Sequence, residues 1–236
     1  MMGTRRGSLR CFRPPGCGAG AGFRSLIRKD FLGAPRSRYA LTQSGDTMKV
    51  LAINGSPRRG GNTQTMIDEA AKALGKAGIE VESVSIRDLD VRPCTGCEMC
   101  FDGSWHCPIK DGGIKLMKRM ASADGIILAS PVYCGGVTAQ MKAIMDRSVI
   151  AYQNKDFKDK VGGAICVGGG SHGGQELAVL QIVSMFAMQD IIVAGPDGGM
   201  PGAMGTANDK GDARKDKDSV QSARELGKRM AELLKR

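Results

Sequence analysis

The chain has 236 residues and a net charge of +10, with 34 Lys or Arg against 24 Asp or Glu. This length favours one domain built around one sizeable core. No apolar run reaches the 18 or so residues needed to cross a bilayer, so we expect a cytoplasmic protein with no membrane partner. Eight cysteines are too few for a disulfide scaffold, and four of them fall between positions 94 and 107. Such clustering indicates metal or redox chemistry.

The first 47 residues differ in composition from the rest of the chain. They carry nine Lys or Arg against two Asp or Glu and have no apolar periodicity, which predicts a basic, disordered extension at 1–47 and a folded domain at 48–236. An over-extended reading frame is favoured over an organellar transit peptide, because Met48 immediately precedes the first strand. The extension contains no recognisable nucleic-acid-binding module, so no nucleic-acid partner is expected.

From Met48 onward, short apolar runs alternate with longer amphipathic segments. Strands are predicted at 49–54, 79–86, 125–130, 161–167 and 190–195, and helices at about 63–77, 113–122, 138–152, 175–188 and 218–234. The segment 195–205 is predicted to be a loop. This alternation predicts an α/β fold with a doubly wound, five-stranded parallel sheet and a cysteine-rich loop after the second strand. In such sheets, ligands bind at the carboxyl ends of the strands.

The first strand runs into a glycine-rich loop, Gly-Ser-Pro-Arg-Arg-Gly-Gly-Asn-Thr at 55–63, and then into a helix. Backbone N–H groups and an arginine at a helix N-terminus suit an anion. Gly61 stands where a Walker motif has its lysine, which disfavours a magnesium triphosphate. Ser56, Arg58, Asn62 and Thr63 can supply the donors for a monophosphate. A glycine-rich turn before a well-capped helix is the alternative.

Three segments resemble the NADPH-dependent FMN reductases, a flavodoxin-like family. The loop at 55–63 resembles their phosphate loop, 130–142 with the following Asp146-Arg147 resembles their isoalloxazine loop and helix, and 168–176 resembles their third loop. The resemblance implies a flavodoxin-like fold that binds FMN. The cofactor-binding residues would be Ser56, Arg58, Asn62, Thr63, Gln64, Pro131, Val132, Tyr133, Cys134, Gly135 and Gly136.

Two features of these loops leave alternatives. Tyr133 can stack on the flavin ring or merely anchor a surface loop. The glycines of 168–173 match the dinucleotide pattern G-x-G-x-x-G, but they follow the fourth strand, and no acidic residue ends the next strand, so a Rossmann dehydrogenase is disfavoured. His172 is a minor candidate for guiding a proton.

The most specific motif is Cys94-x2-Cys97-x2-Cys100-x6-Cys107. Two-residue gaps let a looping backbone turn successive thiols inward, as a cubane iron-sulfur cluster requires. The run resembles a ferredoxin motif, including the proline after the last cysteine, but its final gap is six residues. A zinc site usually pairs two knuckles separated by about 12 or more residues. Zinc therefore remains a less favoured alternative.

Within the same family, the cysteine motif resembles that of the iron-sulfur flavoproteins. This resemblance implies a [4Fe-4S] cluster on Cys94, Cys97, Cys100 and Cys107 that exchanges electrons with FMN. It also implies a homo-oligomer, dimer or tetramer, in which the cluster lies near another subunit's flavin, and a ferredoxin-like carrier or NAD(P)H as redox partner. The alternatives are an NAD(P)H-dependent FMN or quinone reductase without a cluster, and a non-catalytic zinc-stabilised binding protein.

Overall fold

A computed structural model describes residues 47–236 of the chain. The predicted extension at 1–47 lies outside the described residues, apart from Thr47. Residues from Thr47 to Arg236 form one unit. Among the helices of this unit, none is both long enough and apolar enough to span a membrane.

The centre of this unit is a parallel sheet of the order β2-β1-β3-β4-β5. Its strands are β1 (Lys49–Asn54), β2 (Glu80–Ser85), β3 (Gly125–Pro131), β4 (Val161–Gly168) and β5 (Ile192–Ala194), and each neighbouring pair is parallel. β4 is buried along its whole length, and β3 along all but its last residue, as their unbroken apolar runs predict for strands covered on both faces. The predicted doubly wound α/β fold is confirmed.

The prediction of a loop over the whole of 195–205 is wrong, because a sixth strand, β6 (Ala203–Thr206), lies within it. β5 pairs with Val161–Gly163 of β4, whereas β6 pairs with Ile165–Gly168. Two short strands therefore share the fifth position of the sheet. The sequence of β6, Ala-Met-Gly-Thr, lacks a β-branched run. Small residues are needed there, since a β-carbon on Gly205 would stand 2.6 Å from Met66 Sδ.

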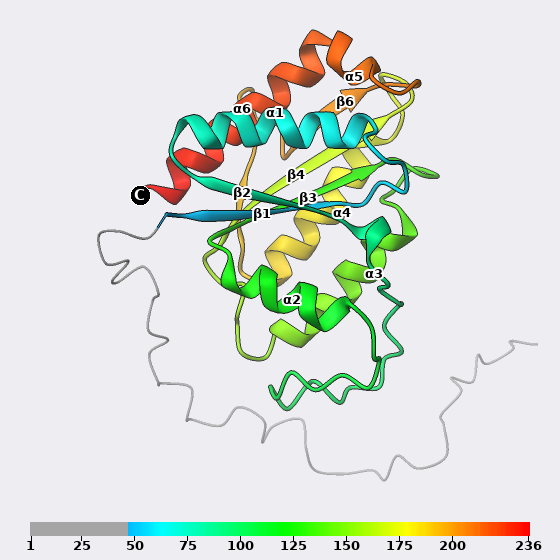
Figure 1. The fold of residues 1–236 in the computed structure, drawn as a ribbon, viewed down its shortest axis with the longest axis vertical. Coiled ribbons are helices and arrows are strands. Elements are labelled where there is room, and N and C mark those ends of the chain that lie inside the picture. The colour runs from blue at the N-terminus through cyan, green and yellow to red at the C-terminus, as the bar shows by residue number, and fades with distance from the viewer. Residues whose placement is uncertain (1–46) are drawn as a thin grey trace, which may run out of the picture. The chain divides into compact units, whose positions relative to one another are not determined.

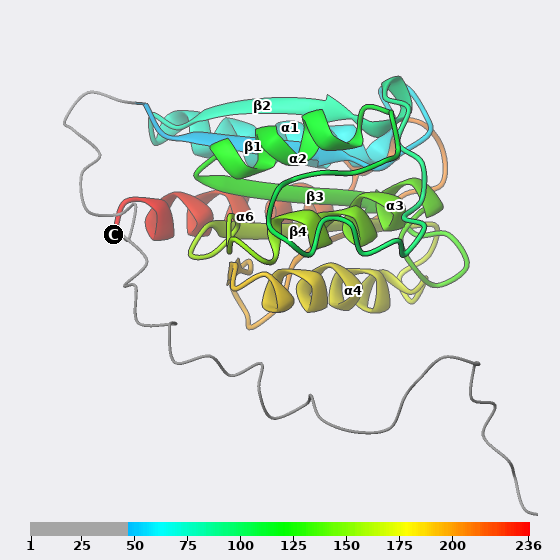
Figure 2. The same ribbon diagram turned by 90° about the horizontal axis from the view of Figure 1, so that it is seen from below.

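Helices cover both faces of the sheet (Figures 1 and 2). α1 (Asn62–Lys76) and α6 (Lys217–Leu234) lie on one face, and α2 (Gly113–Ser122), α3 (Ala139–Arg147) and α4 (Gln175–Met188) on the other. Three short helices, η1 (Ile86–Asp88), η2 (Ser148–Ala151) and α5 (Asp212–Lys215), complete the unit. The helix predicted at 138–152 is thus an α-helix only to Arg147, after which it tightens into the 3₁₀-helix η2.

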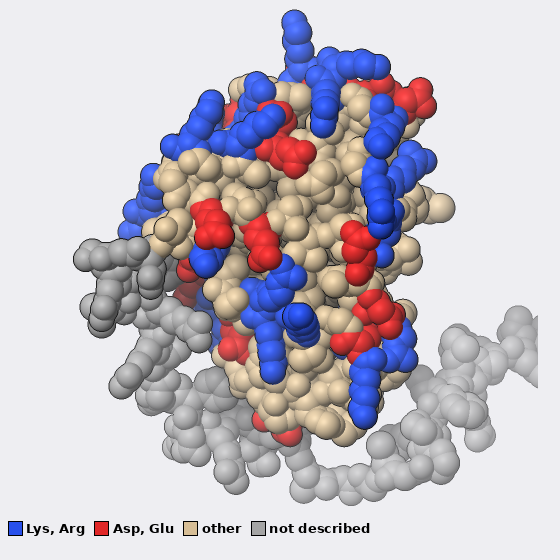
Figure 3. Space-filling view, in the orientation of Figure 1, with Lys and Arg blue, Asp and Glu red and all other residues tan. Residues whose placement is uncertain are grey.

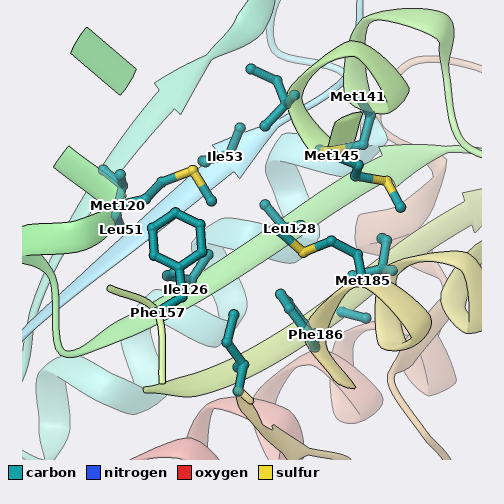
Figure 4. Packing of buried hydrophobic residues seen from close by; sticks show 14 of the residues in the cluster. Leu51, Ile53, Met120, Ile126, Leu128, Met141, Met145, Phe157, Met185 and Phe186 are labelled. Atoms are coloured by element: carbon teal, nitrogen blue, oxygen red, sulfur yellow. The ribbon is translucent and has the colours of Figure 1, made fainter. Parts of the chain in front are cut away.

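Each face of the sheet has its own apolar core. α1 and α6 pack on one side, and Figure 4 shows the other side, where Leu51 and Leu128 of the sheet face side chains from the helices. Five methionines, Met117, Met120, Met141, Met145 and Met185, fill this second core together with Phe157 and Phe186, and all but Met117 are labelled in Figure 4. In doubly wound sheets, the loops at the carboxyl ends of the strands are where ligands bind.

Candidate functional site

A cleft opens at the carboxyl ends of β1, β3, β4 and β6. Its walls are the glycine-rich loop after β1, the segment after β3, the start of the loop after β4 and the segment after β6. This is the edge at which doubly wound sheets bind their ligands.

The glycine-rich loop after β1 is held in place by three backbone N–H hydrogen bonds. Gly55 N donates to the carbonyl of Ala129 (2.7 Å), Ser56 N donates to Asn54 Oδ1 (2.9 Å), and Arg58 N donates to Ser56 Oγ (3.2 Å). Ser56 and Thr63 are 4% and 2% exposed and line the cleft. The loop therefore carries small hydroxyls at the cleft wall on a fixed backbone.

The N-terminus of α1 faces this cleft without an internal cap. Its N-cap residue is Gly61, no side chain accepts a hydrogen bond from the first turn, and that turn holds no acidic residue. The first N–H groups of a helix need acceptors, and the helix dipole favours a negative one. The end of α1 thus has the chemistry of an anion-binding site.

The segment after β3 forms a small hairpin at the rim of the cleft. Tyr133 and Gly136 exchange backbone hydrogen bonds of 2.9 and 3.0 Å, and the two residues between them have φ of 49° (Cys134) and 75° (Gly135). Positive φ at both positions is the geometry of a type I′ turn. The hydroxyl of Thr138 then caps α3 at Met141 N (3.2 Å) and donates to the carbonyl of Gly55 (2.9 Å). Thr138 therefore ties this segment to the glycine-rich loop.

Seven of the eleven predicted cofactor-binding residues line the cleft: Ser56, Arg58, Asn62, Thr63, Pro131, Val132 and Tyr133. The other four do not. Cys134, Gly135 and Gly136 form the hairpin beyond the cleft wall. Gln64 points elsewhere, because its side chain accepts a hydrogen bond from Asn54 (2.8 Å) and donates to Asp68 (2.8 Å). His172 is exposed and also lies outside the lining.

Seven further lining residues were absent from the predicted cofactor-binding set: Gly61, Val167, Gly168, Gly169, Ala207, Asn208 and Lys210. The last three follow β6, the strand that the sequence did not indicate. Asn62 explains how this distant segment reaches the cleft. Its Nδ2 donates to the carbonyl of Asp209 (2.8 Å), and its Oδ1 accepts from Gly211 N (2.9 Å) and Ala213 N (3.3 Å). The side chain of Asn62 therefore positions a loop.

The four clustered cysteines lie on a long loop, residues 89–112, between η1 and α2 (Figure 1). A buried ion pair closes its base. Arg147 donates from both terminal nitrogens to the carboxylate of Asp111 (2.8 and 3.1 Å) and from Nη1 to the carbonyl of Arg92 (3.0 Å). The Asp111 carboxylate also accepts from Arg92 N (2.8 Å) and Gly113 N (2.9 Å). Asp111 and Arg147 thus hold the two ends of the cysteine loop together.

The far end of the cysteine loop rests on the segment after η2. Trp105 Nε1 donates to the carboxylate of Asp156 (3.0 Å), and Asn154 Nδ2 donates to the carbonyl of Gly103 (2.8 Å). The loop is therefore anchored at its base and at its far end, and the cysteines lie in the stretches of chain that join these two anchors.

The thiols themselves are accessible. Cys94 and Cys97 are exposed, and Cys100 and Cys107 are half-buried. Burial raises the pKa of the Cys100 thiol, and the nearby thiolates of Cys107, Cys94 and Cys97 raise it further. Four thiols on one loop supply the number and kind of ligand that an iron-sulfur cluster takes. They are not gathered around a common point, because among the described residues no three His, Cys, Asp or Glu side chains are grouped so that they could hold a metal ion. No cysteine of residues 47–236 lines the cleft.

The sheet order, together with an anion-ready loop after β1, defines a flavodoxin-like protein. Solved structures agree: one of RosB has a TM-score of 0.64 at 19% identity, covering 80% of this chain and 79% of that one. A flavodoxin from the domain Archaea has a TM-score of 0.54 at 17% identity, covering 80% of this chain and all of that one (100%).

The sequence comparisons are more specific than the fold. The family model for NADPH-dependent FMN reductase matches residues 48–209. An iron-sulfur flavoprotein of Methanocaldococcus jannaschii is 43% identical over 190 residues, 80% of this chain and 98% of that protein. One of Methanosarcina thermophila is 37% identical over 189 residues, 79% and 95% of the two chains. The chain belongs to the NADPH-dependent FMN reductase family, among its iron-sulfur flavoproteins, and is an FMN-dependent oxidoreductase.

Proposed function

We propose that the chain is an electron-transfer flavoprotein that binds FMN in the cleft and a [4Fe-4S] cluster on the cysteine loop. The observation that carries this proposal is the presence of two separate sites of different chemistry. The cleft offers an uncapped helix N-terminus, hydroxyls and an arginine, whereas the cysteine loop offers four thiols on a frame closed by a buried ion pair.

In the cleft, the FMN phosphate would be bound by the first N–H groups of α1, by the hydroxyls of Ser56 and Thr63, and by Arg58. The flavin ring would lie along Pro131, Val132 and Tyr133. FMN exchanges electrons either in pairs or singly, and the protein binds and orients it. Thr138 and Asn62 would keep the walls of the cleft in place through the hydrogen bonds described above.

On the cysteine loop, Cys94, Cys97, Cys100 and Cys107 would be the cluster ligands. A [4Fe-4S] cluster carries single electrons, at a potential that depends on hydrogen bonding and exposure. The exposed position of Cys94 and Cys97 supports exchange with an external protein carrier of the ferredoxin type. NAD(P)H is the alternative donor, and the cytoplasm is the compartment that we propose.

A homo-oligomer would bring the two sites together. Within residues 47–236, no cysteine lines the cleft of its own subunit. Met99 and Phe101 on the cysteine loop are each 47% exposed, and Tyr133 at the rim of the cleft is 45% exposed. Apolar side chains at both sites support packing of one subunit's cysteine loop against another's cleft. Sedimentation of the native protein measures the subunit number, and a monomer would contradict this arrangement.

Cofactor analysis of protein purified without oxygen tests the proposal. We expect about four iron, four sulfide and one FMN per chain. Cys97→Ser should lose iron and keep FMN, whereas Cys134→Ser, which alters an exposed cysteine outside the loop, should keep both. FMN without iron, even after reconstitution, would indicate a flavin or quinone reductase without a cluster. A colourless protein that contains zinc would indicate a zinc-stabilised binding protein.

A further inference from the structure

Lys210 lines the cleft but lies neither in the glycine-rich loop nor within the residues that the family model matches. It lines the cleft from the segment after β6, one position beyond the end of the family match at residue 209. Its side chain lies over the glycine-rich loop: a β-carbon on Gly60 would stand 3.8 Å from Lys210 Cε and 3.9 Å from Nζ. The ammonium group thus reaches the part of the cleft where α1 begins.

The segment that carries Lys210 is fixed. The three hydrogen bonds of the Asn62 side chain bind Asp209, Gly211 and Ala213, on both sides of the lysine. Ala207 N also donates to the carbonyl of Gly168 (2.8 Å), which joins the segment to the end of β4. Lys210 is therefore presented to the cleft from a backbone that is hydrogen-bonded to two of its walls.

Within residues 47–236, the Lys210 ammonium has no carboxylate partner. Asp212 lies two residues further along the chain, but its carboxylate forms an ion pair with Lys215 (3.0 Å) and not with Lys210. Figure 3 shows Lys and Arg side chains, with Asp and Glu among them, at the end of the molecule where α5 lies. The attraction for an anion therefore comes from the Lys210 ammonium itself and not from the net charge of this end of the molecule.

The charge of the ligand decides how many cations it needs. A phosphomonoester carries about −1.5 to −2 near pH 7. A helix N-terminus contributes about +0.5, and Arg58 contributes one full charge. These two together leave a negative charge of about −0.5 on a fully dianionic phosphate, and one further cation more than offsets it.

We propose that Lys210 is the second cation that binds the FMN phosphate, and that it makes the cleft select FMN over unphosphorylated riboflavin. The inference rests on the proposed function, because it assigns a residue to the FMN site. Asn62 is then a positioning residue that holds the lysine over the phosphate.

The test is flavin affinity of the full-length chain, measured from flavin fluorescence during titration with FMN and with riboflavin. Lys210→Met should weaken FMN binding about tenfold, the loss of one charge-assisted contact, and leave riboflavin binding unchanged. Lys210→Arg should restore most of the FMN affinity. Lys215→Met is the matched control, because it removes the same charge five residues away, where the lysine is already paired with Asp212.

The outcomes separate the two claims. A wild-type chain that binds no FMN overturns the proposed function. A wild-type chain that binds FMN, with Lys210→Met leaving that affinity unchanged or weakening both flavins equally, overturns the role of Lys210 alone. A weaker dependence of FMN affinity on salt in Lys210→Met than in Lys215→Met would support a direct charge contact.

Discussion

The ion pair between Asp111 and Arg147 is the residue-scale feature on which the cysteine loop depends. The two side chains are 0% and 2% exposed, so removing one leaves the other charged group buried without its partner. Such a loss destabilises a protein by about 3 kcal/mol or more. We expect Asp111→Asn to lower the free energy of unfolding by that amount, as measured by urea denaturation, and to speed the release of iron from the purified protein.

Asp102→Asn is the matched control, because Asp102 lies on the same loop but is exposed and accepts a hydrogen bond from Ser104 N. Its effect on the free energy of unfolding should stay below about 1 kcal/mol. Equal unfolding midpoints for Asp111→Asn and the wild type would show that the buried pair does not stabilise the fold.

The same carboxylate predicts a dependence of stability on pH. Burial acts to raise the pKa of Asp111, but hydrogen bonds from Arg147, Arg92 N and Gly113 N outweigh it, so the pKa lies below its ordinary value of 3.8. A depressed folded-state pKa contributes stability that is present above the unfolded value and lost as the pH falls through the folded one. The stability difference between wild type and Asp111→Asn should therefore narrow below about pH 4. A constant difference from pH 6 to pH 3 would refute this.

At the scale of elements, the close approach of α1 and α6 depends on one glycine. A β-carbon on Gly227 of α6 would stand 2.4 Å from the carbonyl oxygen of Ala70, a backbone atom that cannot turn aside. At Gly75 of α1, nothing lies within 4 Å of the same added atom. Helix propensity alone favours alanine over glycine by about 1 kcal/mol at both positions.

We therefore expect opposite effects from two identical substitutions. Gly75→Ala should raise the free energy of unfolding by about 0.5 to 1 kcal/mol, whereas Gly227→Ala should lower it by about 1 to 3 kcal/mol through overpacking. Thermal unfolding of the two variants measures both. If Gly227→Ala also stabilised the chain, the two helices would not be packed as closely as described.

The spacing of apolar residues along the chain accounts for the strands and helices that could be predicted from the sequence. The apolar runs of β3 and β4 predict buried parallel strands, and both are confirmed. β6 could not be found this way, because its four residues form a strand through pairing with β4 rather than through their own propensity. Beyond Arg147, Ile150 and Ala151 continue the buried pattern of the helix, so periodicity did not distinguish η2 from α3.

The same limit applies to the cleft. Ser56, Arg58 and Thr63 lie on one contiguous loop before a helix, so their common role could be predicted locally. Asn208 and Lys210 come about 150 residues later. They reach the cleft through the pairing of β6 with β4, the hydrogen bond from Ala207 N to Gly168 and the hydrogen bonds of Asn62. Contacts of this kind depend on the topology of the whole sheet.

Across the whole molecule, different structural elements position the cleft and the cysteine loop. The cleft lies on the ends of β1, β3, β4 and β6, whereas the cysteine loop follows η1 and is held by Arg147 of α3 and by the segment after η2. No residue of the cysteine loop lines the cleft. The two proposed cofactors should therefore bind independently within one subunit.

Removal of iron tests this independence. Chelation of iron from the reduced protein, or Cys97→Ser, should leave the FMN dissociation constant unchanged within about twofold. FMN at 100 times that constant should then stabilise both the iron-containing and iron-free protein by about 2.7 kcal/mol, because the effect depends only on FMN affinity for the folded state. Urea unfolding with and without FMN measures this increment. Loss of FMN together with iron would instead mean that the cluster itself is needed for flavin binding, beyond the packing of a neighbouring subunit's cysteine loop against the cleft that we propose.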